Sequence, residues 1–169
     1  MVTIKIRHIF LTLLISLSAL SGKAQESADF EKFAQDFFIL LSDTAEYPNL
    51  EYIRIKTWRE LIAQQNLSDS EKQELEIRKN KEYNKERATF ENKLGFLVQS
   101  FYEMVDKGGK LSLTFSDYQP HAKWNNAYHC SLKIFYESEG VQSIVNLEYD
   151  LYYNGRGLMF IGDKLEAEY

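Results

Sequence analysis

The hydrophobic pattern of this chain changes its period once, near residue 110, and this change limits the folds open to it. Before that point apolar residues recur every three to four positions, which is typical of amphipathic helices. After it they alternate with polar residues, which is typical of antiparallel strands with one buried face. The order of helices and then strands predicts an α+β fold, with N-terminal helices packed on one face of a four-stranded antiparallel β-meander.

Two helices are expected before residue 66. The first begins near Ser27 or Ala28 and ends near residues 42–44. Its apolar residues all fall on one helical face, as a core-facing stripe does: Phe30, Phe33, Ala34, Phe37, Phe38 and Leu41. A turn at Tyr47-Pro48-Asn49 separates it from a second helix, predicted from about Leu50 to Gln65.

A third helix is expected from Asp69 to Asp106. Ser68 and Glu71 have the spacing of a capping box, and Gly108-Gly109 follows its end. Unbroken, it would be roughly 57 Å long at about 1.5 Å per residue. That is longer than a compact domain of this size is wide, at ~30–35 Å. Its charged first half must therefore project, bend or form a separate helix, either as a solvated face or as an arm for a partner.

Four strands are expected between residues 110 and 162. The alternating segments cover residues 111–115, 128–136, 145–153 and 158–161, and Asn154-Gly155 is a strong hairpin turn. Residues 116–126 are expected to form a long loop, and residues 163–169 a short acidic tail. No second domain is expected after residue 24.

The first 24 residues have the layout of a secretory signal peptide. A basic start is followed by an apolar run from Ile9 to Leu20, and Gly22 and Ala24 occupy the −3 and −1 positions of a cleavage site. The apolar run is too short for a comfortable membrane span. We therefore expect residues 25–169 to form a single exported domain, periplasmic or extracellular, with no stable membrane anchor after cleavage.

Charge and cysteine content exclude several classes of function. Cleavage would remove Lys5, Arg7 and Lys23 but no acidic residue, and would change the net charge from −5 to −8. An acidic domain of this kind is not expected to bind nucleic acid. Cys130 is the single cysteine, so an intramolecular disulfide is impossible. No phosphate loop, nucleophile elbow or calcium loop occurs, and no cofactor is expected.

Polar residues on the strands are the first group of candidates for a site. Glu148 and Asp150 lie two residues apart on one strand face, and His129 and Tyr152 share that face in the expected register. Together they could perform acid–base chemistry if they lined a pocket. Outward polar positions on an open sheet face explain them more simply.

The predicted loop over residues 116–126 is the second candidate. Tyr118, His121 and Trp124 are the kinds of residue that recognise partners from loops. The alternative is that Trp124 folds back and caps the sheet. His121 and His129 lack metal-ligand spacing, so no metal site is expected. His129 and Cys130 are neighbours on a strand, so they point to opposite faces and form no catalytic pair.

The order of elements, with the ending from Tyr152 to Asp163 and its Tyr-x-Asn-Gly turn, resembles secreted domains of the cystatin-like and NTF2-like type. The resemblance covers about the last 60 residues and is a pattern of elements rather than of chemical residues. It implies helices on one face of a curved sheet, a pocket between the two, and dimerisation through the sheet. The chain departs from the pattern in placing all its helices first and in its charged third helix.

The sequence thus favours a non-enzymatic binding domain that takes a partner protein or a small ligand, alone or as a homodimer. One alternative is an NTF2-like enzyme with a carboxylate or histidine pocket. Another is a structural accessory of the cell envelope. An enclosed cavity lined by the polar strand residues favours the enzyme, whereas a solvent-facing polar sheet over a filled core favours binding.

Overall fold

The computed structural model describes residues 27–43 and 50–168, so the predicted leader lies outside the described residues. Residues 27–42 are helical, and a short helix and a long helix follow them, α2 (Ile55–Ala63) and α3 (Asp69–Asp106). Four strands complete the chain: β1 (Lys110–Pro120), β2 (Ala127–Ser138), β3 (Val141–Tyr153) and β4 (Leu158–Glu168). They form one antiparallel sheet in the order β1-β2-β3-β4. The predicted α+β class, with helices packed on a meander, is confirmed.

The main core lies between one face of the sheet and two helices. The aromatic stripe of the N-terminal helix packs there beside α3, and Phe37 is fully buried against Tyr149 and Phe160. Tyr102 on α3 donates a hydrogen bond to the Leu40 carbonyl, so the two helices also contact each other. Apolar side chains of both helices and of the sheet pack together there.

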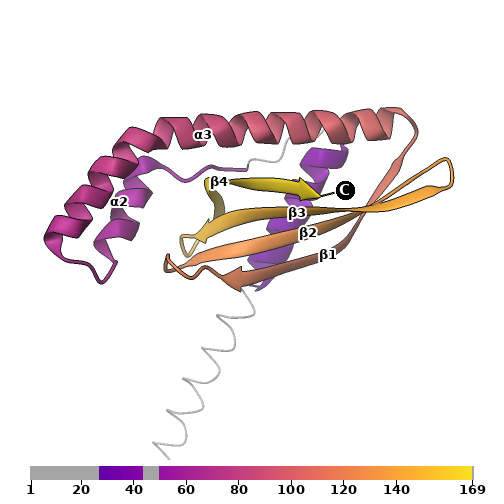
Figure 1. Cartoon of the computed structure of the whole chain (residues 1–169). Coiled ribbons are helices and arrows are strands. Elements are labelled where there is room, and N and C mark those ends of the chain that lie inside the picture. The colour runs from indigo at the N-terminus through magenta and orange to yellow at the C-terminus, as the bar shows by residue number, and fades with distance from the viewer. Residues whose placement is uncertain (1–26, 44–49, 169) are drawn as a thin grey trace, which may run out of the picture.

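Helix α3 is one unbroken element of 38 residues. Its capping box is formed, because the Glu71 backbone N–H donates to Ser68 Oγ and the Ser68 backbone N–H donates to the Glu71 carboxylate. Figure 1 shows its C-terminal part running along the sheet and its N-terminal part curving past the sheet beside α2. The charged half therefore both projects and curves, and it packs against α2 instead of forming a separate helix.

A second, smaller core lies on the other face of the sheet, at the end where α2 packs. It joins Trp58 and Leu61 of α2 to residues of three strands: Ala127 of β2, Tyr152 of β3, and Met159 and Ile161 of β4. The cross-strand pairs Ala127↔Tyr152 and Tyr152↔Met159 place these strand residues on the face opposite the main core. The expectation that this whole face is polar and uncovered is therefore wrong at the α2 end.

The second helix is shorter than predicted, because residues 50–54 are not helical. The Ile53 N–H donates to the Phe160 carbonyl and the Phe160 N–H donates to the Glu51 carbonyl, both at 2.8 Å. These bonds form a parallel bridge between this segment and β4. Pairing with the sheet here outweighs the helical spacing of the local apolar residues.

Two strands are longer than predicted. β1 continues to Pro120, so the connection to β2 is reduced to residues 121–126. β4 continues to Glu168, beyond the predicted end of the sheet at residue 162. Each strand carries an irregularity that the alternation conceals: the β1 register shifts between Leu113 and Phe115, and the β3–β4 register shifts between Tyr149 and Leu151. The first shift places Phe115 opposite Lys133, off the alternation that groups it with Leu111 and Leu113.

Within residues 27–43 and 50–168, no helix combines the length and the apolar character that a membrane span requires.

Candidate functional site

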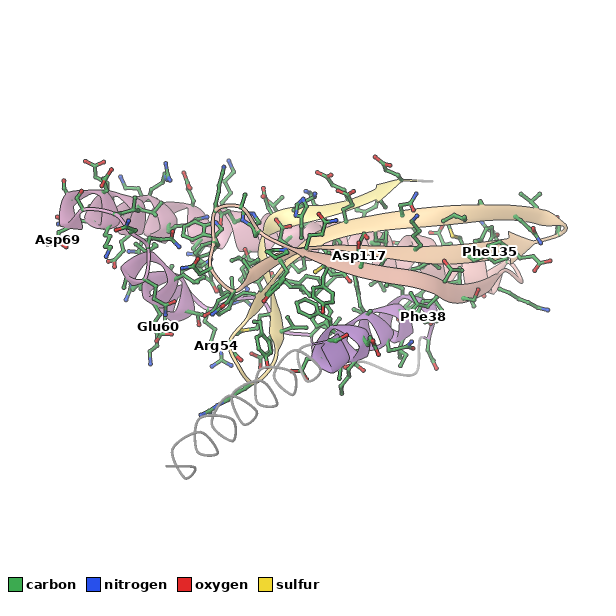
Figure 2. The ribbon with its side chains drawn as sticks, turned by 90° about the horizontal axis from the view of Figure 1, so that it is seen from below. Phe38, Arg54, Glu60, Asp69, Asp117 and Phe135 are labelled. Atoms are coloured by element: carbon green, nitrogen blue, oxygen red, sulfur yellow. The ribbon has the colours of Figure 1, made fainter. Side chains whose placement is uncertain are left out.

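The candidate site lies on the outer face, by which we mean the sheet face opposite the main core. Among the described helices, α2 covers one end of this face, and the half-exposed side chains of His129 and Glu148 show that its middle is open to solvent. Three neighbouring strands place polar side chains there: His129 on β2, directly opposite Asp150 on β3, together with Glu148 on β3 and Lys164 on β4. In Figure 2, Asp117 and Phe135 mark the sheet, and Phe38 marks the N-terminal helix that packs against it.

The four side chains form one hydrogen-bonded chain, the polar cluster. His129 Nδ1 contacts Asp150 Oδ1. Lys164 Nζ lies 2.8 Å from His129 Nε2 and 2.8 Å from Glu148 Oε2. Asp150 and Lys164 are mostly covered, with side chains 15% and 22% exposed, whereas those of His129 and Glu148 are 51% and 53% exposed. The cluster thus presents the imidazole and one carboxylate to solvent.

These contacts define the tautomer of His129. The Lys164 ammonium has donors only, so His129 Nε2 must accept its hydrogen bond. The ring proton then lies on Nδ1 and is donated to Asp150. Both ring nitrogens of His129 are therefore engaged within the cluster.

Acidic side chains outnumber basic ones around the cluster. The hydrogen bond from Lys164 lowers the pKa of the Glu148 carboxyl below its ordinary value. Glu166 is directly opposite Glu148 on β4, where two like charges repel. Lys164 is therefore the local counter-charge for a mainly acidic patch of the sheet.

A shallow hollow of about 170 Å³ opens beside the cluster. Asp117 and Gln119 on β1, Ser131 on β2, and the exposed groups of His129 and Glu148 contribute to its lining. It is open to solvent and has the size of a side-chain end rather than of a cofactor.

Four of the seven predicted site residues come together here. His129, Glu148 and Asp150 belong to the cluster, and the His121 ring lies edge-on to the His129 ring at 6.1 Å between centroids. His121 is held in place by its backbone N–H, which donates to the Ala127 carbonyl.

The other three predicted residues pack against aromatic or apolar partners, although Tyr118 also borders the hollow. Tyr118 is half-buried and stacks on Phe30 at 3.9 Å between centroids. Trp124 packs edge-on against Trp58 at 5.0 Å, in the second core. Tyr152 shares the face of Asp150 but is buried in that same core by α2. Of the two alternatives for Trp124, its position is therefore that of a residue folded back onto the sheet.

Cys130 lies on the buried side of β2, as its alternation with His129 predicts. Burial raises the pKa of its thiol well above the ordinary value. A buried, protonated thiol is a small apolar residue of the core.

Sequence reasoning missed Lys164, the residue that ties the cluster together. Residues 163–169 were expected to be a tail, yet Lys164, Glu166 and Glu168 alternate with Leu165 and Ala167. That period of two is the signal that could have revealed a strand. Asp117 was missed because residues 116–126 were expected to be a loop.

The contacts of the cluster suit hydrogen bonding and charge recognition. Among the described residues, no group of three His, Cys, Asp or Glu side chains is arranged to hold a metal ion. The His129–Asp150 pair has the form of a general base held by a carboxylate, but Lys164 occupies the nitrogen that would take up the proton.

Comparison with known proteins finds no match, whether with family models, curated proteins or solved structures.

Proposed function

We propose that this chain is an exported, non-enzymatic binding domain, periplasmic or extracellular, whose outer face recognises a partner. One observation carries the proposal. Three predicted residues, His129, Glu148 and Asp150, gather on a solvent-facing part of the sheet, whereas apolar and aromatic side chains pack between the sheet and the helices. An interaction surface needs open, fixed polar groups, whereas a catalytic pocket needs enclosed ones.

The polar cluster suits recognition because its members hold each other in place. Asp150 and Lys164 fix the ring of His129, so little side-chain entropy is lost when a partner binds. The carboxylates of Asp117, Glu148 and Glu166 make a neutral or cationic partner surface more favourable than an anionic one.

We further propose that the arrangement is of the cystatin-like or NTF2-like kind. The N-terminal helix and α3, packed together on one face of an antiparallel sheet, support this assignment, whereas α2 covers one end of the other face. In this reading the uncovered side of the sheet is used for binding.

The alternative of an NTF2-like enzyme rests on the His129–Asp150 pair, which could act as a base if Lys164 moved away. The alternative of an envelope accessory rests on the charged half of α3, which extends past the sheet (Figure 1).

Affinity capture tests the proposal against both alternatives. The full chain, expressed with its leader and recovered from the exported fraction, serves as bait for that fraction, and bound molecules are identified by mass spectrometry. We expect a stoichiometric protein partner that is lost with Glu148→Gln and retained with Glu82→Gln, an equal change on the exposed surface of α3.

Other outcomes would contradict the proposal. Loss of capture with Glu82→Gln alone would favour the α3 arm. A turned-over small molecule, with turnover abolished by His129→Ala, would favour the enzyme.

A further inference from the structure

The free edge of the sheet at β1 points to a second copy of this chain. β1 pairs with β2 along one side only. On its other side, no backbone hydrogen bond joins its 11 residues to another part of the chain that the structure describes. Figure 1 shows β1 at the edge of the sheet away from β4 and α3. A long unpaired edge is a template for another strand.

The edge at β4 is different, because other segments cover part of it. Residues 51–53 hydrogen bond to Phe160, and Lys93 Nζ donates to the Asp163 carbonyl at 2.7 Å. The longer uncovered edge is therefore that of β1.

The register shift in β1 between Leu113 and Phe115 allows two β1 strands to pair so that opposite charges face each other. Lys110 is opposite Glu137 and Asp117 is opposite Ser131, two β2 positions of the outer face. Because Thr114 is an extra residue between them, Lys110 and Asp117 share that face although they are seven positions apart. In a regular strand, residues with that spacing lie on opposite faces.

We propose that two copies pair antiparallel along β1, about a twofold axis between Leu113 and Thr114. In this register Lys110 faces Asp117 of the second copy, and Asp117 faces Lys110 of the second copy. Both side chains are exposed, and neither forms an ion pair within the described chain. The pairing joins two four-stranded sheets into one continuous sheet and uses the backbone groups that are otherwise unpaired.

The second copy also adds a residue to the candidate site. Asp117 lines the hollow beside the polar cluster, so Lys110 of the second copy reaches its margin. The dimer then carries two hollows on one continuous outer face. This inference does not depend on the proposed function, because a dimer forms or fails to form whatever the partner is.

Charge reversal tests the register. Lys110→Asp creates two like-charged contacts across the twofold axis, and so does Asp117→Lys. We expect the wild-type full chain to dimerise in sedimentation equilibrium. Each variant alone should dimerise about tenfold more weakly or worse. An equimolar mixture of the two variants regains opposite charges at both contacts, so it should associate as the wild type does.

Several results would overturn the inference. They are a wild type that is monomeric over the whole concentration series, a dimer unaffected by either variant, and a mixture that does not recover association. Asp117 Oδ1 also accepts a hydrogen bond from the Tyr118 N–H, so circular dichroism must confirm that both variants fold.

Hydrogen exchange of the wild type provides the second measurement, should a variant fail to fold. Amides of residues 111–117 should become more protected as concentration rises, and constant protection would contradict the pairing. If the chain dimerises as expected but captures no partner, the proposed function fails and the dimer inference stands.

Discussion

At the scale of single residues, position decides which aromatic and polar groups are free to act. Trp124 and Tyr118 have the composition of a recognition loop, yet each packs against another ring, Trp58 and Phe30 respectively. His129 and Glu148, by contrast, keep about half of their side-chain surface exposed. Residue type alone predicted all four as recognition residues, and burial is what distinguishes the packed pair from the exposed pair.

Trp124→Ala should destabilise the fold. The half-buried ring covers Trp58 in the second core, so its removal should lower the free energy of unfolding by about 2 kcal/mol, less than for a fully buried tryptophan. Urea unfolding measures this, with Trp124→Phe as the control that keeps a ring. An unchanged midpoint for Trp124→Ala, together with weaker partner capture, would instead place the residue in the recognition surface.

Lys164→Met should raise the pKa of Glu148 toward its ordinary value, because it removes the hydrogen bond that lowers this pKa. A carboxyl with a lowered folded-state pKa stabilises the fold above its unfolded-state pKa, and this contribution is lost as pH falls through the folded-state pKa. The variant should therefore lose less than about 1 kcal/mol at neutral pH, since Glu148 is half exposed, and the loss should shrink below about pH 4.

Carbon-13 NMR titration of the glutamate carboxyls measures this effect, with Lys81→Met on α3 as the matched control. A Glu148 titration that is the same in the wild type and in Lys164→Met would contradict the described contact.

At the scale of elements, periodicity predicted the helices and the central strands because their burial is regular. The N-terminal helix and the cap of α3 lie where the sequence places them. The errors fall on segments whose partners are distant in sequence: residues 50–54, which bond to β4, and the ends of β1 and β4. Local pattern cannot reveal a bulge or a helix that covers the second face of a sheet. For that reason the sequence placed Tyr152 in the site and missed Lys164.

Ser68→Ala should weaken the start of α3. The hydroxyl of Ser68 accepts a hydrogen bond from the Glu71 N–H, and loss of such a cap costs about 1 kcal/mol. Thermal unfolding should show the loss for Ser68→Ala and a much smaller one for Ser68→Asp, which preserves an accepting oxygen. Equal stability of all three proteins would show that the cap does not contribute.

Gly162→Ala and Gly95→Ala should have opposite effects. Gly162 has φ +73° where β4 departs from its register with β3, and an alanine there should cost about 1–2 kcal/mol. Gly95 lies within α3 with open space around its Cα, and an alanine there should stabilise the helix by about 0.5–1 kcal/mol. Urea unfolding measures both, and a shift of the same sign for the two variants would contradict the described β4 backbone.

At the scale of the whole molecule, packing on the two faces of the sheet determines which surface stays open. The main core covers one face of the sheet, and the second core covers one end of the opposite face. What stays open is the middle of the outer face, where the polar cluster lies. The chain is net negative, so this surface also approaches cationic partners more readily than anionic ones.

The central claim is that partners bind this open part of the sheet. Hydrogen–deuterium exchange of the full chain, free and bound to the captured partner, tests it most directly. We predict that protection on binding appears in β2, β3 and the part of β4 around Lys164, and that the N-terminal half of α3 is unchanged. Protection confined to α2 and the N-terminal half of α3, with none on the strands of the outer face, would contradict the account.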